Sequence, residues 1–118
     1  MNQPTPDVSQ ADVDRIMRRD FPSEAIQQVL AVLAEYGKED YHREIVRVQL
    51  AVLKLADGSI ENLHQEIQGA KCDYRDILSY SEYPNYTKRA FSIDKLSYAE
   101  RKAVIDADWK QYNDWLAP

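Results

Sequence analysis

The sequence predicts an all-α protein, a four- to five-helix bundle with a central antiparallel helical hairpin. Apolar residues recur at helical spacing along most of the chain, and Gly37 and Gly58 stand where two of these stretches end. No stretch alternates apolar and polar residues as a strand does. With 118 residues, 44% of them hydrophobic, we expect a flexible tail over residues 1–8 and a single helical domain over residues 9–118.

The first two helices are expected to meet at a corner at Phe21-Pro22. A helix that begins at Ser9 must end at Phe21, because Pro22 lacks an N–H and clashes with the preceding turn. Pro22 suits the first turn of a second helix of about fifteen residues, which Gly37 ends. The apolar stripe of this second helix is Ile26, Val29, Leu30, Leu33 and Tyr36.

The next helix, expected over residues 39–56, is the one around which the chain is organised. It carries two adjacent apolar stripes: Tyr41, Ile45, Val48, Val52 and Leu55 form one, and Val46, Leu50 and Leu53 form the other. Two stripes predict neighbours on two sides and burial over most of the circumference. Gln49 lies within the apolar arc, where a buried amide must find a hydrogen-bond partner.

Two further helices complete the prediction. The short link Asp57-Gly58-Ser59 predicts an antiparallel helix over residues 60–81, in which Gly69 marks either a close helix crossing or a weak point. Residues 86–96 are expected to form the longest loop. Ser97 and Glu100 then form a capping box for the last helix, which is expected to dock through its aromatic residues.

Composition narrows the function classes. The net charge is -5 and the pI is about 5.0, which weighs against nonspecific binding to phosphate backbones or anionic lipid. No secretory signal pattern and no membrane-length apolar run occurs, so we expect a cytoplasmic protein. Cys72 is the only cysteine, in agreement with a reducing compartment.

Both histidines follow a glutamate by three residues, at Glu39-x-x-His42 and Glu61-x-x-His64. Ferritin-like bundles use this spacing to present two metal ligands on one helix face. Here the two motifs open consecutive antiparallel helices, which holds them roughly 25 Å apart. We therefore expect no metal site and no cofactor within one chain. The alternative function is a ferritin-like metal-binding protein whose site is completed across a dimer.

No residue is predicted to be catalytic. Cys72 is expected on an outer helix face beside Lys71 and Asp73, without a base that would activate its thiol. The chain also lacks the GxSxG signature of a nucleophile elbow. A non-enzymatic role follows.

The candidate interaction surface is aromatic and consists of Tyr80, Tyr83, Tyr86 and Trp115, which lie off the main apolar stripes. It predicts a protein partner and, in particular, a self-associating homodimer. A second strip combines Tyr86 and Tyr98 with basic residues and is the one place suited to RNA or another single strand, which is the second alternative. Its basic members are Lys88, Arg89, Lys95, Arg101 and Lys102.

The N-terminal third resembles CUE and UBA-like ubiquitin-binding modules in Ile16, Phe21-Pro22, Ile26, Leu30 and Gly37. The resemblance implies a three-helix fold and ubiquitin as a partner, although Asp20 stands where that family has a methionine. VQLAVLKLADG at residues 48–58 and DYRDILSYSEYP at residues 73–84 resemble short, uncharacterised bacterial helical proteins, a resemblance that implies a helical fold and no particular activity.

Overall fold

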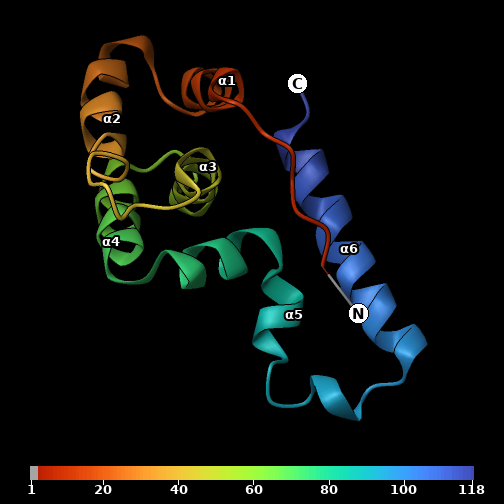
Figure 1. The fold of residues 1–118 in the computed structure, drawn as a ribbon. Helices are drawn as coiled ribbons and strands as arrows, with labels where there is room; N and C mark the ends of the chain where they lie inside the picture. Colours follow the sequence, from red (N-terminus) through yellow and green to blue (C-terminus); the bar gives the residue numbers. More distant parts are fainter. Residues whose placement is uncertain (1–2) are drawn as a thin grey trace.

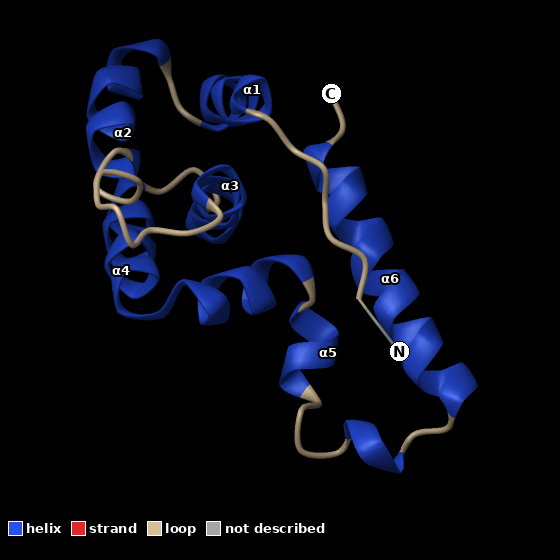
Figure 2. Cartoon of the chain, viewed as in Figure 1, coloured by secondary structure: helices blue, strands red, loops and turns tan. Residues whose placement is uncertain are grey.

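The computed structural model describes residues 3–118 and confirms the all-α class (Figures 1 and 2). The described residues contain six α-helices, two short 3₁₀ turns and no strand. The helices are α1 (Gln10–Asp20), α2 (Ile26–Leu33), α3 (Ile45–Ala56), α4 (Ile60–Glu82), α5 (Pro84–Lys88) and α6 (Tyr98–Leu116), and the 3₁₀ turns span Ser23–Ala25 and Ile93–Lys95. The sequence does not predict α5, which overlaps the start of the segment expected to be an irregular loop.

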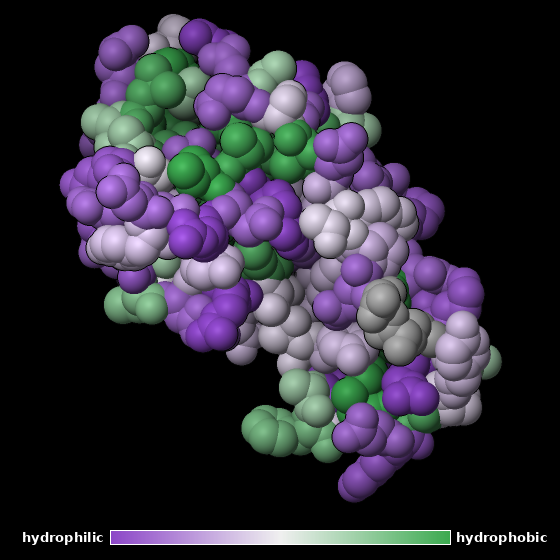
Figure 3. Space-filling model, in the orientation of Figure 1, coloured by the Kyte–Doolittle hydropathy of each residue, from purple (hydrophilic) through white to green (hydrophobic). Residues whose placement is uncertain are grey.

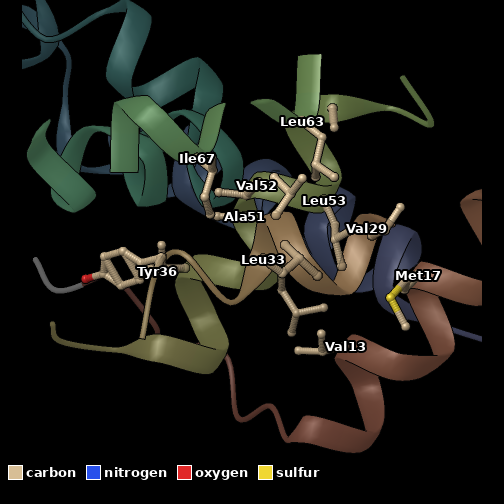
Figure 4. Close-up of a cluster of buried hydrophobic side chains, with 14 of the residues drawn as sticks. Val13, Met17, Val29, Leu33, Tyr36, Ala51, Val52, Leu53, Leu63 and Ile67 are labelled. Atoms are coloured by element: carbon tan, nitrogen blue, oxygen red, sulfur yellow. The ribbon is translucent and has the colours of Figure 1, made fainter. Parts of the chain in front are cut away.

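Helix α3 is the centre of the core, as its two apolar stripes predict. It packs most extensively against α4, with which it forms the antiparallel hairpin, and next against α1 (Figure 1). Val52 and Leu53 are fully buried, and Figure 4 shows Leu53 close to Val29 and Leu33 of α2. Each such side chain contributes about 1.5–3 kcal/mol through burial, so these contacts account for the hairpin's central place.

The predicted start of this central helix is wrong by several residues. Helix α3 begins at Ile45 rather than at residue 39, and residues 34–44 form a compact loop. Tyr41, which the periodic pattern placed on the buried stripe, is 71% exposed. The helix cannot extend backwards because Glu44 has a left-handed backbone, with a φ of 55°.

Helix α2 is also shorter than predicted, since it ends at Leu33 and not beside Gly37. The side-chain amide of Gln49 donates hydrogen bonds to the carbonyls of Leu33 and Tyr36, at 3.2 and 3.1 Å. These carbonyls lie at and beyond the end of α2, where the helix itself supplies no donor. The predicted partner for this buried amide is therefore the backbone that terminates the preceding helix.

Helix α4 covers the predicted range but breaks at Asp73, whose backbone is extended (φ -154°, ψ 99°). The Asp73 carboxylate accepts from the Arg75 N–H at 3.1 Å, as an N-cap does for the second half of the helix. The break turns the chain sharply (Figure 1) and brings Ile77 over Gly69. A Cβ on Gly69 would lie 3.1 Å from the end of the Ile77 side chain, so the glycine allows a close approach between the two halves of α4 rather than a crossing with another helix.

The capping box that opens α6 is confirmed. Ser97 accepts from the Glu100 N–H at 3.1 Å, and the Glu100 carboxylate accepts from the Ser97 N–H at 3.3 Å. Further along α6, the fully buried carboxylate of Asp108 accepts from the N–H groups of Asn85 and Tyr86 and so caps the start of α5. This contact joins α5 to α6.

The far end of α6 is fastened to α1. The guanidinium groups of Arg15 and Arg19 donate to the carbonyls of Leu116 and Trp115, and Arg19 lies 5.3 Å from the centre of the Trp115 ring. Cations at a helix C-terminus are favoured by the helix dipole as well as by these bonds. Trp109 is half-buried and Tyr112 is buried, so α6 docks partly through aromatic residues as predicted.

Residues 3–8 contain no helix and lie along the bundle. Pro6 is buried, Val8 packs against the core, and the Tyr83 hydroxyl donates to the Pro4 carbonyl at 2.6 Å. The predicted flexible tail includes residues 1–2, which lie outside the described residues. Its flexibility stays a prediction, while the backbone of residues 3–8 has defined contacts.

Candidate functional site

Residues 84–104, which we call the arm, project from the rest of the molecule. The arm comprises α5, the 3₁₀ turn Ile93–Lys95 and the first turns of α6 (Figure 1). Within it only Ile93 is buried, and Ile105 closes its base. The projection lengthens the molecule to 48 Å and gives a radius of gyration of 14.9 Å, above the ~13.5 Å of a compact domain of this length. Because the arm buries so few of its own side chains, it is a surface feature rather than part of the bundle.

Charge divides sharply between the arm and the rest of the chain, which we call the body. The arm holds five basic residues and two acidic ones, a formal charge of +3, whereas the body holds 10 basic and 18 acidic residues, a formal charge of -8. Lys88, Arg89 and Lys95 are exposed, and no acidic side chain among residues 3–118 forms an ion pair with any of them. The arm therefore presents uncompensated positive charge.

Aromatic groups accompany this charge. The Phe91 side chain is fully exposed and Tyr98 is 65% exposed. Between α5 and α6 lies a small, mainly apolar hollow of about 260 Å³, lined by Asn85, Arg89, Ala103, Val104 and Ala107. Figure 3 shows apolar and hydrophilic side chains side by side on this projecting end. Exposed rings and an apolar hollow on one projecting segment are features of an interaction surface rather than of a solvated face.

The four aromatic residues that the sequence assigned to an interaction surface differ in exposure and lie in different parts of the structure. Tyr80 is 50% exposed, and Tyr86 and Trp115 are half-buried. Tyr83 is 4% exposed, because residues 3–8 cover it, so it is a core residue and not a surface one. Trp115 packs against the main core at the opposite end of α6, so the four do not form one patch. Whether Tyr80 or Tyr86 contacts a partner stays a prediction.

The two histidines lie in different settings. His42 belongs to the loop before α3, and its Nδ1 accepts from the N–H groups of Gly37 and Glu39 at 2.8 and 3.3 Å. His64 is exposed in the first turns of α4. Among residues 3–118 no three His, Cys, Asp or Glu side chains come together as metal ligands. The helical ExxH geometry expected at Glu39 and His42 is absent, since neither residue is in a helix.

A buried ion pair supports the base of the arm. Arg47 of α3 donates to both carboxylate oxygens of Glu82, at 3.1 and 2.7 Å, and the Glu82 side chain is 4% exposed. Burial opposes the charged guanidinium, but the bonds to Glu82 and Glu44 outweigh it and raise the pKa of Arg47. The neighbouring Tyr83 is also affected, because burial raises the pKa of its phenol to about 12. These groups are structural and hold α3, α4 and the N-terminal segment together.

Cys72 is exposed, as predicted, and lines a hollow of about 430 Å³ between α4 and the loop before α3. Sequence reasoning found the basic residues of the arm but missed Phe91 and Asp108. Phe91 stands in a segment without apolar periodicity, so no pattern shows its exposure. Asp108 lies on the helical arc of Ile105 and Tyr112, and an acid on an apolar arc is the signal that could have revealed a buried cap.

Comparisons with protein-family models, with curated proteins and with solved structures give no match to this chain. Among residues 3–118 no helix has both the length and the apolar character that a bilayer crossing requires.

Proposed function

We propose that this chain is a non-enzymatic protein-interaction module that associates with a second copy of itself, with the arm as the contacting surface. The observation that carries the proposal is the opposition between an arm of charge +3 and a body of charge -8 within one chain. The arm of one copy and the body of another attract each other over roughly a Debye length, about 8–10 Å near physiological salt. A body of this charge instead repels a polyanion such as RNA.

Reciprocal docking satisfies both arms. In a two-fold dimer the arm of each copy contacts the body of the other, so both copies contribute the same surface to the interface. Phe91 supplies a ring that burial on a partner would remove from water, and Lys88, Arg89 and Lys95 supply charges without partners of their own. A buried aromatic side chain surrounded by a charged rim is the usual anatomy of such a contact.

The test is the mass in solution, measured by sedimentation equilibrium in about 0.1 M and about 1 M NaCl, between which the Debye length falls from ~10 to ~3 Å. We expect a dimer that weakens in high salt. Phe91→Ser and Lys88→Glu should each raise the dimer dissociation constant about tenfold or more, or ~1.4 kcal/mol. Lys110→Glu, the same charge change outside the arm, makes the body more acidic and should not raise the dissociation constant.

Two results would overturn the proposal. One is a monomer at every concentration and salt. The other is a dimer that Tyr80→Ser disrupts and Phe91→Ser does not, which would return the interface to the surface predicted from the sequence. The arm's basic and aromatic residues also suit a single-stranded nucleic acid. Salt-sensitive retardation of a uridine oligonucleotide by a monomeric protein, lost in Lys88→Glu, would assign the arm to that function instead.

A further inference from the structure

A second hollow, remote in sequence from the arm, has the features of a small-molecule site. It measures about 430 Å³ and lies between the loop of residues 34–44 and the broken part of α4. Four of its nine lining residues carry aromatic rings, namely Tyr36, Tyr41, His42 and Tyr74, and the other five are Ala70, Lys71, Cys72, Asp73 and Arg75. Ligand pockets commonly have this size and combine rings with a few placed polar groups.

The loop that forms one wall is tightly built. The Tyr36 hydroxyl donates to the Arg43 carbonyl at 2.7 Å and accepts from the Arg43 N–H at 3.1 Å, which closes the loop on itself. Burial raises the pKa of Tyr36, so its phenol keeps its proton and these bonds across the neutral range. Gly37 turns the chain with a φ of 129°, a backbone that other residues rarely adopt. The wall is therefore formed before any ligand arrives.

His42 is fixed within this wall. Its ring stacks on Tyr36 with the centroids 4.3 Å apart and the planes 13° apart, and Tyr41 stands nearly perpendicular to it, at 74° and 5.0 Å. Because Nδ1 accepts two backbone N–H groups, the hydrogen of the neutral ring is on Nε2. Nε2 has no protein partner among residues 3–118, which leaves a positioned donor beside the rings of Tyr36 and Tyr41.

The opposite wall carries the cations. Lys71 pairs with Glu35 at 2.9 Å, and Arg75 pairs with Asp73 at 3.0 Å. Arg75 donates to both Asp73 oxygens, at 3.0 and 3.2 Å, through its Nε and one terminal nitrogen. Its side chain is 77% exposed, and its other terminal nitrogen, which has no protein partner among residues 3–118, is the group that can reach a ligand anion. The break in α4 at Asp73 brings these charges to the hollow, since the helix changes direction there.

We propose that this hollow binds a small planar aromatic acid. The ring of the ligand stacks against the exposed face offered by Tyr41, and its carboxylate is held by Arg75 and by the Nε2–H of His42. Rings alone would accept any apolar compound, whereas the positioned donor and the guanidinium select an anion. The site is independent of the arm and of self-association.

Three probe compounds separate the contributions of the aromatic ring and of the carboxylate to binding. Indole-3-acetate has both ring and carboxylate, indole lacks the charge, and acetate lacks the ring. The readout is the ¹H–¹⁵N NMR shift of the amides of Gly37 and Arg75 in the full chain. We expect saturable shifts with indole-3-acetate at millimolar concentration, at least fivefold weaker binding of indole, and none of acetate. A second readout is slower alkylation of Cys72 by iodoacetamide, because the bound ligand covers the only thiol.

Two variants in the hollow and one control outside it test whether the ligand binds there. Tyr41→Ala and Arg75→Gln change exposed side chains, so the fold is retained, and each should weaken indole-3-acetate at least fivefold. Tyr80→Ala removes an exposed tyrosine outside the hollow and should have no effect. Equal affinity for indole and indole-3-acetate, or shifts that persist in Tyr41→Ala and Arg75→Gln, would overturn the proposal, as would the absence of any shift.

Discussion

The ion pair between Arg47 and Glu82 should contribute far more to stability than its geometry alone suggests, because it is buried. Both carboxylate oxygens are bonded, and Glu82 has 4% of its side chain exposed. Removing Arg47 leaves a buried carboxylate without a cation, a loss that costs about 3–5 kcal/mol. Removing Glu82 costs less, about 2–3 kcal/mol, because the 19% exposed Arg47 keeps Glu44 as a second partner.

A double-mutant cycle measures the coupling between the two residues directly. Arg47→Met, Glu82→Leu and the double variant are unfolded with urea at neutral pH, and helix content is followed by circular dichroism. We expect a coupling free energy of about 2–3 kcal/mol. The double variant should therefore be about as stable as Arg47→Met alone, because removing the carboxylate that Arg47→Met leaves unpaired has no further cost.

The matched control is the pair between Lys110 and Asp114. Its nitrogen–oxygen distance is 2.6 Å, as short as that of the buried pair, but the side chains are 76% and 66% exposed. Its coupling should be below about 0.5 kcal/mol. Equal coupling in the two cycles would refute the view that burial, rather than distance, sets the contribution of these pairs.

Three further predictions concern the core and its turns. The contribution of Tyr83 to stability should fall by at most ~2.7 kcal/mol between about pH 10 and 12, because Tyr83 has a pKa of about 12 when folded and its ordinary value of 10.0 when unfolded. Tyr83→Phe should remove this part of the fall in urea titrations. Gly58→Ala should lower the free energy of unfolding by about 1–2 kcal/mol, since Gly58 has a φ of 77° and an added Cβ would lie 3.2 Å from the Asp20 carbonyl oxygen. Gln49→Leu should cost about 1–3 kcal/mol in the same assay, because it leaves the buried Tyr36 carbonyl without a donor and the Leu33 carbonyl with only the Tyr36 N–H.

Local signals in the sequence were sufficient for the class of the fold and for several helix ends. The apolar stripes and the capping box at Ser97 depend on residues a few positions apart. The structure confirms the capping box and buries the stripe residues Val48, Leu50, Val52 and Leu53, whereas Tyr41 and Ile45 of the same stripes are exposed. The start of α3 could not be found in this way. It depends on the hydroxyl of Tyr36, which reaches Arg43 across the loop, and no periodic pattern encodes that contact.

The surface was harder to predict for a similar reason. Tyr83 is a core residue because a distant N-terminal segment covers it, and its own helix gives no sign of that cover. The basic residues of the arm could be grouped from the sequence because they are close in the chain. Their separation from the acidic body, and the exposure of Phe91, depend on how α5 and α6 leave the bundle.

The way α6 ends has a consequence for how the chain can vary. Arg15 and Arg19 hold main-chain oxygens, so hydrogen bonding alone specifies where the helix stops and not which side chains occupy its final turn. Inserting a single residue upstream would swing those oxygens by about 100° around the axis, away from both guanidinium groups. The length of α6 is thereby constrained by these hydrogen bonds, in addition to the packing of the Trp115 ring against Arg19 and the core.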